Sequence, residues 1–243
     1  MHRFYVRPQD VETKAITLDR AESKHAYSVM RLRKADEILC FDGIGNEYTG
    51  VVDALSATQG VIAVKKKVHY DPPVFQLTLA AAIPKQSRFD EIVDNATQLG
   101  VHAIIPLVTE RTVVKSAVSR LEHKQERWHK IAVEAAKQCG CAYVPQVFAA
   151  ESFSRAVARA GSFDAALIPA LDPEAVSLKK VLRAAPKPGK VIVFIGPEGD
   201  FSPDEITEAR KNTCRVVSLG VNVLRCATAA TMVLSVLRYE WEN

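Results

Sequence analysis

The chain has 243 residues, of which 48% are hydrophobic and 25% are charged, and its formal net charge is +4. These values are ordinary for a globular protein that can bury a core without disulfide bonds or a structural metal, so they exclude a disordered chain and a small disulfide-rich scaffold. The apolar runs are only strand-sized, the N-terminus has no signal-like stretch, and the five cysteines contain no CxxC pair. We therefore expect a cytoplasmic protein without a membrane span or a metal site.

Residues 1–71 predict a small β-barrel domain. Four short runs are rich in β-formers, and one helical segment interrupts them. The expected strands are 4–6, 38–41, 47–53 and 61–68, and the expected helix is 21–32. The segment 42–46 (DGIGN) is typical of a hairpin turn. The proline pair at 72–73 favours extended backbone and indicates a linker.

Residues 72–243 predict an α/β domain. Apolar strand-like runs alternate with helical patterns throughout this part, which is typical of a mostly parallel sheet covered on both faces. We expect strands at 75–83, 102–108, 143–148, 164–168, 190–195 and 215–219, and helices at 87–99, 120–139, 152–160, 177–184, from 202 onward and at 226–241. Ser202, Pro203 and Glu205 together predict a capping box at the start of one helix.

Cations gather in the first domain. Arg20, Lys24, Arg31, Arg33 and Lys34 lie close together in the sequence, with His25 and Tyr27 between them. Such a cluster suits a phosphate backbone with unpaired bases, and it is equally the pattern of an ordinary solvated face.

Two strands near the C-terminus end directly in glycine-bearing loops. The strand 191–195 is followed by Gly196, and the strand 215–219 is followed by Gly220 and an apolar segment that carries Arg225. Ligands of open α/β sheets bind beyond the carboxyl ends of strands, where glycines let the backbone approach closely. The pattern indicates a site for an adenosine-like ligand, and the alternative is two ordinary strand-to-helix turns.

These loops resemble a known family. The segments 195–202 (IGPEGDFS) and 219–229 (LGVNVLRCATA) are similar to the two knot motifs of the RsmE family, which are SPOUT-class methyltransferases. Other family-like features follow in order along nearly the whole chain: His25 with 29–31 (VMR), 42–43 (DG), Lys85, 98–101 (QLGV), 110–111 (ER) and 128–136 (WHKIAVEAA).

The resemblance implies a PUA-like RNA-binding barrel at 1–71 and a SPOUT domain with a trefoil knot at 72–243. It implies an S-adenosylmethionine-dependent enzyme that methylates uracil N3 of a uridine in small-subunit ribosomal RNA, naked or assembled, and that forms a homodimer through the knot domain. The implied cofactor residues are Leu167, Ile168, Ile195, Gly196, Glu198, Gly199, Leu219, Gly220, Leu224, Thr228 and Ala229. The candidates for RNA contact are Arg7, His25, Arg31, Arg33, Lys34, Lys85 and Arg111.

The chemistry itself indicates two catalytic candidates. Methylation at N3 requires loss of the N3 proton, and negative charge then spreads onto the flanking carbonyl oxygens. Arg225 is the candidate that stabilises this charge, because a guanidinium stays protonated and presents a planar set of donors. Glu198 is the candidate that accepts the proton or positions the substrate, and capping of its own loop is the alternative role.

Several positions depart from the family pattern. Ala227 and Gln98 stand where the family usually has glutamate, Asn95 replaces a lysine, Cys141 an arginine and Asp200 a glycine. The expected fold and cofactor pocket depend on glycines, apolar residues and backbone groups, which remain. The departures leave two alternatives open: a related knotted methyltransferase with another RNA target, and a non-catalytic RNA-binding or ribosome-assembly protein.

Overall fold

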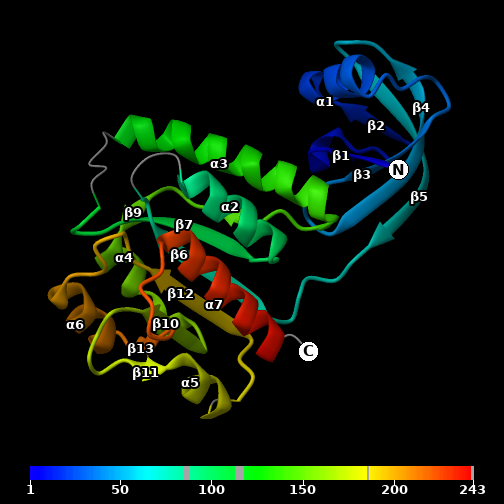
Figure 1. The fold of residues 1–243 in the computed structure, drawn as a ribbon. Helices are drawn as coiled ribbons and strands as arrows, with labels where there is room; N and C mark the ends of the chain where they lie inside the picture. The colour runs from blue at the N-terminus through cyan, green and yellow to red at the C-terminus, as the bar shows by residue number, and fades with distance from the viewer. Residues whose placement is uncertain (85–87, 113–117, 185, 242–243) are drawn as a thin grey trace. The chain divides into compact units, whose positions relative to one another are not determined.

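A computed structural model describes residues 1–84, 88–112, 118–184 and 186–241 (Figure 1). Its contacts divide the chain into two compact units. The first unit consists of Met1–Pro72 together with Val133–Val144, and the second consists of Pro73–Ala132 and Pro145–Asn243. A short stretch from the middle of the chain thus groups with the N-terminal residues, although the sequence predicts a linear boundary at residue 71.

The first unit is built on a five-stranded sheet with the strand order β1-β3-β4-β5-β2. Strands β1 and β3 pair in parallel, and the other neighbours pair antiparallel. The strands are β1 (His2–Tyr5), β2 (Ala15–Leu18), β3 (Glu37–Phe41), β4 (Asn46–Leu55) and β5 (Gly60–His69), and a 3-10 turn covers Pro8–Asp10. Phe4, Ile16, Ile38 and Ile62 form the centre of a core cluster that is closed to solvent.

The predicted hairpin turn at 42–46 is confirmed, and Asp42 holds it together. This carboxylate is buried and accepts hydrogen bonds from the backbone amides of Ile44 (3.0 Å) and Asn46 (3.1 Å) and from the hydroxyl of Tyr48 (3.2 Å). The turn allows β3 to pair with β4 from Phe41 opposite Glu47 onward.

The helix predicted at 21–32 is shorter than expected. Helix α1 (Arg20–Lys24) is capped at its N-terminus by Asp19, whose side chain accepts a hydrogen bond from the amide of Glu22 at 2.8 Å. A wider π-helical turn, His25–Val29, follows it, and Arg31 then has φ = 56°. Because this left-handed conformation cannot continue a helix, the helical segment ends before residue 32.

An ion pair is buried inside the first unit. Lys137, near the C-terminal end of α3 (Val118–Cys139), donates to the carboxylate of Glu22 at 2.8 Å. The exposed fractions of the two side chains are only 7% and 10%. Glu134 also accepts from Lys137 at 3.1 Å, but its own side chain is 66% exposed.

The second unit contains a parallel sheet with the order β11-β13-β10-β12-β6-β7-β8, and β9 also pairs with β7. The strands are β6 (Gln76–Ala82), β7 (Ala103–Val108), β8 (Gln146–Val147), β9 (Glu151–Ser152), β10 (Ala165–Pro169), β11 (Val176–Ser177), β12 (Lys190–Ile195) and β13 (Arg215–Ser218). The predicted α/β class with a parallel sheet is therefore confirmed.

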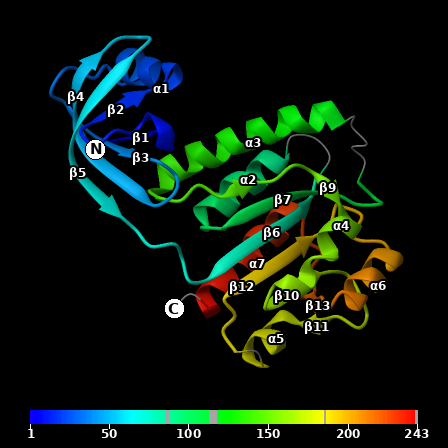
Figure 2. The same ribbon diagram turned by 180° about the vertical axis from the view of Figure 1, so that it is seen from behind.

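Helices cover both faces of this sheet (Figures 1 and 2). Helices α2 (Phe89–Gln98) and α7 (Cys226–Trp241) pack together, with α7 on β6 and β12. Helices α4 (Phe153–Val157) and α6 (Pro203–Lys211) share a core cluster with the opposite side of β12. Helix α5 (Leu178–Ala184) packs on β11 and β13. A 3-10 turn at Ala160–Ser162 follows α4. None of the described helices combines the length and apolar character needed to cross a membrane.

Local sequence explains why two of these helices lie where predicted. At α6, Ser202 accepts from the amide of Glu205, and Glu205 in turn accepts from the amide of Ser202, which confirms the capping box. In α3, Trp128 is buried and packs at a tilt against Phe89, with ring centroids 4.4 Å apart, which fixes this helix against α2.

Candidate active site

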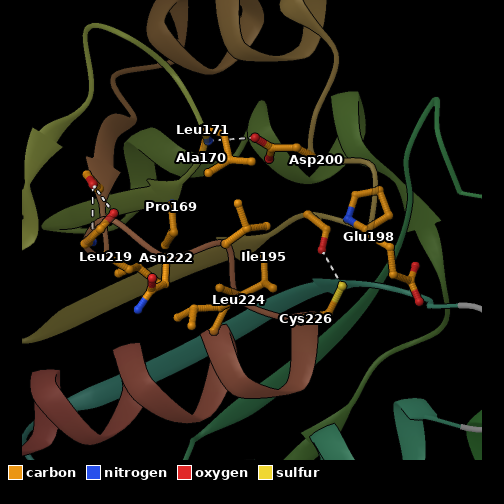
Figure 3. Close-up of a pocket in the computed structure, with 16 residues that line it drawn as sticks. Pro169, Ala170, Leu171, Ile195, Glu198, Asp200, Leu219, Asn222, Leu224 and Cys226 are labelled. Atoms are coloured by element: carbon orange, nitrogen blue, oxygen red, sulfur yellow. Dashed lines mark hydrogen bonds between the residues drawn. The ribbon is translucent and has the colours of Figure 1, made fainter.

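A pocket lies at the carboxyl ends of three adjacent strands, β12, β10 and β13 (Figure 3). Its empty space measures about 600 Å³ when the open mouth is included. Leu219 and Asn222 lie at one end and Glu198 at the other (Figure 3). The lining residues are Pro169, Ala170, Leu171, Ile195, Gly196, Pro197, Glu198, Asp200, Ser218, Leu219, Gly220, Asn222, Val223, Leu224, Cys226 and Ala229.

Asp200 joins two of the loops that form the pocket. Its carboxylate accepts a hydrogen bond from the amide of Leu171, in the loop after β10, at 2.6 Å, and another from the amide of Phe201 at 2.8 Å. Its backbone is left-handed, with φ = 61°. The two hydrogen bonds therefore offset the steric cost of a side chain in this conformation.

We expect Asp200→Ala to destabilise the protein by about 1–3 kcal/mol, because it removes both hydrogen bonds and keeps the unfavourable φ. Asp200→Gly loses the same bonds but relieves the backbone strain, so its cost should be smaller by about 1 kcal/mol. Thermal denaturation of the two variants measures this difference, and equal losses would contradict the role given to the backbone.

Glycines keep the pocket open. A Cβ atom at Gly196 would come within 3.1 Å of the Phe201 ring and 3.2 Å of Asp200 Oδ1, so a side chain does not fit there without movement of these neighbours. Gly220 has φ = +126°, a conformation that side chains rarely adopt, and no atom lies within 4 Å of the place of its missing Cβ. The backbone at both loops is thus accessible from the pocket.

The charge of the lining favours a cationic ligand group. The described residues that line the pocket include two carboxylates, Glu198 and Asp200, and no lysine, arginine or histidine. The thiol of Cys226 donates to the carbonyl of Gly196 at 3.0 Å. Burial, with the nearby charge of Glu198, raises the pKa of this thiol to about 11, so Cys226 is a protonated hydrogen-bond donor and not a nucleophile at neutral pH.

A second, polar hollow adjoins this pocket, and we call it the charged hollow. Its lining consists of Pro84, Arg88, Glu91, Glu198, Arg225, Cys226, Ala227 and Thr228, and it encloses roughly 540 Å³ including open solvent. Glu198 and Cys226 line both spaces and therefore form the wall between them. Within the described residues, no cluster of histidine, cysteine, aspartate or glutamate could hold a metal ion.

The structure brings most of the sequence-predicted cofactor residues together. Those that line the pocket are Ile195, Gly196, Glu198, Leu219, Gly220, Leu224 and Ala229. Leu167 and Ile168 instead lie buried inside β10, and the three residues after them face the pocket. Gly199 lies outside the lining, with its carbonyl bound by Arg111, and Thr228 lines the charged hollow.

Sequence reasoning missed several lining residues. Pro169, Ala170 and Leu171 continue the strand that it did identify, so the end of β10 was the available signal. Arg88 and Glu91 belong to α2, far from the C-terminal motifs, and no local pattern connects them to the site.

The candidates for RNA contact occupy different environments. Arg7 pairs with Asp10 at 2.7 Å, and Lys34 lies 3.3 Å from Asp53. His25 is half-buried with its ring edge-on to Phe4, which gives it a structural contact in the first unit. Arg31 and Arg33 are exposed. Arg111 donates to the carbonyl of Gly199 at 2.6 Å in the second unit, and Lys85 lies outside the described residues.

Comparison with known families covers both parts of the chain. A model of the RNA methyltransferase domain matches residues 71–238, and a model of the RNA methyltransferase PUA domain matches residues 18–64. The ribosomal RNA small subunit methyltransferase E of Synechocystis is 33% identical over 96% of this chain and 76% of its own length. The protein of the same name from Bacillus subtilis is 27% identical over 100% of this chain and 98% of its own.

Solved structures agree with these matches. A Legionella pneumophila methyltransferase in complex with bound S-adenosylmethionine superposes with a TM-score of 0.89 at 28% identity, over 98% of this chain and 96% of that one. The Neisseria gonorrhoeae ribosomal RNA small subunit methyltransferase E, also bound to S-adenosylmethionine, has a TM-score of 0.88 at 26% identity, over 99% and 98% of the two chains. The pocket at the carboxyl ends of β10, β12 and β13 thus lies in a chain that belongs to the ribosomal RNA small subunit methyltransferase E (RsmE) family, with its PUA domain and its RNA methyltransferase domain.

Proposed function

We propose that this protein transfers a methyl group from S-adenosylmethionine to uracil N3 of a uridine in small-subunit ribosomal RNA. The observation that carries the proposal is the glycine-bordered pocket beside the charged hollow, in a chain of the RsmE family. We propose the cytoplasm as its location, because ribosomal RNA is the proposed substrate.

The residues of the pocket fit the cofactor. S-adenosylmethionine carries a sulfonium and an ammonium group, and the two carboxylates of the lining complement these charges. Leu219, Leu224 and Ile195 provide apolar surface for an adenine ring, and the open backbone at Gly220 leaves room beside it.

Residues at the wall between the two spaces would perform the chemistry. S-adenosylmethionine supplies an electrophilic methyl carbon when it is bound. Glu198 lines both spaces, and its carboxylate would accept the N3 proton of a base in the charged hollow. Arg225 lines only the hollow and would stabilise the negative charge that develops on a uracil carbonyl oxygen.

The direct test uses the purified protein with S-adenosylmethionine and small ribosomal subunits or naked small-subunit RNA from a strain that lacks this gene. Mass analysis of the digested nucleosides should show N3-methyluridine only when the protein is present. A methyl group on another base or atom, or none with either RNA, would overturn the proposal.

The exposed cations of the first unit are proposed to bind the RNA backbone. We expect the double variant Arg31→Gln/Arg33→Gln to weaken RNA binding, while the affinity for S-adenosylmethionine stays the same. The slope of the logarithm of the RNA binding constant against the logarithm of salt concentration should fall by the equivalent of up to about two phosphate contacts. Filter binding at several salt concentrations measures the slope. The control Lys179→Gln/Lys180→Gln removes the same charge from exposed positions on α5, and an equal effect of both variants would contradict specific contact.

We also propose that the second unit has the trefoil knot that the family resemblance implies, and that two copies of this unit associate. The support is exposed apolar surface at the mouth of the pocket, where the residues Val221, Val223 and Leu171 are 100%, 73% and 65% exposed. A homodimer would cover such a patch. Light scattering at several concentrations tests this part of the proposal.

A further inference from the structure

The charged hollow contains two arginines, and only one of them is suggested by the C-terminal motifs. Arg225 precedes α7, whereas Arg88 stands at the N-terminal end of α2. Both line the hollow together with Glu91, Glu198 and the thiol of Cys226. These are all the titratable or charged groups among its described lining residues.

The charge of Arg88 acts on the wall that the hollow shares with the cofactor pocket. Cys226 lies in the shared wall, where burial and the negative charge of Glu198 raise the pKa of its thiol and the positive charge of Arg88 opposes them. The guanidinium of Arg88 is thus within electrostatic reach of the wall where a methyl group would be transferred.

Uracil has a symmetry that matches this arrangement. Its N3 lies between two carbonyl groups, and when the N3 proton leaves, the negative charge is shared by O2 and O4. One fixed cation can stabilise only one of these oxygens closely, so a site for this reaction benefits from a donor on each side of N3.

Building on the proposed function, we propose that the charged hollow binds the target uracil by its imide edge, with Arg88 and Arg225 each donating to one of the two carbonyl oxygens. The N3 proton passes to the Glu198 carboxylate, which becomes a neutral carboxylic acid, and the N3 lone pair is left facing the shared wall. Arg88 is then a catalytic residue, because it contacts the base.

The arrangement also selects the base. Arginine side chains only donate hydrogen bonds, and both oxygens of uracil accept them. Cytosine carries an amino group in place of O4, so one guanidinium would face another donor and lose its partner. The hollow therefore discriminates against cytosine by an unpaired donor. The N3 atom of cytosine also carries a lone pair in place of a proton, so it cannot donate to the Glu198 carboxylate as uracil N3 does.

The test compares Arg88→Gln with the control Arg183→Gln, which removes an exposed cation of α5 outside the site. Single-turnover methyl transfer is measured against pH on small-subunit RNA transcribed with uridine or with 5-fluorouridine, whose N3 proton is more acidic. We expect Arg88→Gln to lower the rate at neutral pH on the order of 10²-fold on uridine RNA. The loss should be smaller on 5-fluorouridine RNA and should diminish as pH rises, because an imide that ionises more easily needs less help from a cation.

A second readout does not depend on activity. The ¹⁹F chemical shift of 5-fluorouridine monophosphate bound to the protein reports ionisation of the ring, and its midpoint should lie at lower pH with the wild type than with Arg88→Gln. A rate loss that is equal for both RNAs at every pH, with an unchanged ¹⁹F midpoint, would overturn the inference and assign Arg88 a structural role. The proposed function fails separately, if the wild type itself transfers no methyl group to uridine N3.

Discussion

Arg225→Ala should lose methyl transfer by a factor on the order of 10²–10³ while it keeps the affinity for S-adenosylmethionine, as expected when one donor to a developing oxyanion is removed. The two effects separate because Arg225 lines the charged hollow and not the cofactor pocket. The fold should be unaffected, since the carbonyl of Arg225, and not its side chain, accepts from the amide of Ala229 at 2.8 Å at the start of α7.

Calorimetry measures the cofactor affinity of Arg225→Ala, and single-turnover transfer of a labelled methyl group measures its rate. Arg183→Ala serves as the control for loss of one exposed positive charge. If Arg225→Ala transferred methyl groups as fast as this control, the electrostatic role of Arg225 would be disproved. A parallel loss of cofactor binding would instead place Arg225 in the cofactor pocket.

Lys137→Met should lower the free energy of unfolding by about 3–5 kcal/mol, because it leaves the Glu22 carboxylate buried without its ion-pair partner. The pair is not fully satisfied even in the wild type, since Glu22 Oε2 is buried and accepts no hydrogen bond within the described structure. Urea-induced unfolding followed by circular dichroism measures the loss. Lys130→Met, at an exposed position of the same helix, should change stability little.

The stability cost of Lys137→Met should depend on pH, because Glu22 titrates. Burial raises the pKa of Glu22 despite the opposing hydrogen bond and charge of Lys137, so protonation of Glu22 is favoured by the fold. The cost of Lys137→Met should therefore shrink as pH falls and Glu22 becomes neutral, and Glu22→Gln/Lys137→Met should recover much of the stability. A cost that is independent of pH would show that lost packing dominates.

The wild type should lose stability at high pH for a related reason. Burial alone would lower the pKa of Lys137, but its hydrogen bonds and charge interactions with Glu22 and Glu134 together raise it. The stabilisation by protonated Lys137 is complete below the unfolded pKa of about 10.4 and is lost as pH rises through the higher folded value.

Sequence reasoning succeeded for elements that local chemistry specifies. Helix α6 has its capping box and helix α7 its long apolar pattern, so both begin where expected. Strands β2, β9 and β11 were missed because two to four residues carry too little pattern, and they are strands only through their pairing partners. The expected strand 143–148 is reduced to the two residues of β8 that pair with β7.

The residues of the site also fall into those that local sequence indicates and those that only the folded structure brings together. The glycine loops after β12 and β13 were identifiable because glycine directly after an apolar strand is a local signal. Arg88 joins Arg225 only through the packing of α2 beside α7, which no spacing in the sequence encodes. The resemblance to the RsmE family indicated the loops after β10, β12 and β13, which line the pocket, whereas Leu167 and Ile168 themselves lie buried in β10.

The first unit is assembled from two separate stretches of chain, and this has a consequence for biosynthesis. Arg3 donates to the carbonyl of Cys141 at 2.7 Å, and the amides of Gly45 and Val144 bond to the carbonyls of Ala142 and Gly43. Because translation proceeds from the N-terminus, these bonds must wait until residue 144 has emerged from the ribosomal exit tunnel. A gene fragment that encodes only residues 1–72 would lack Cys141, Ala142 and Val144, which are the partners in these bonds. A fragment designed to fold as the first unit should therefore include residues 133–144 as well.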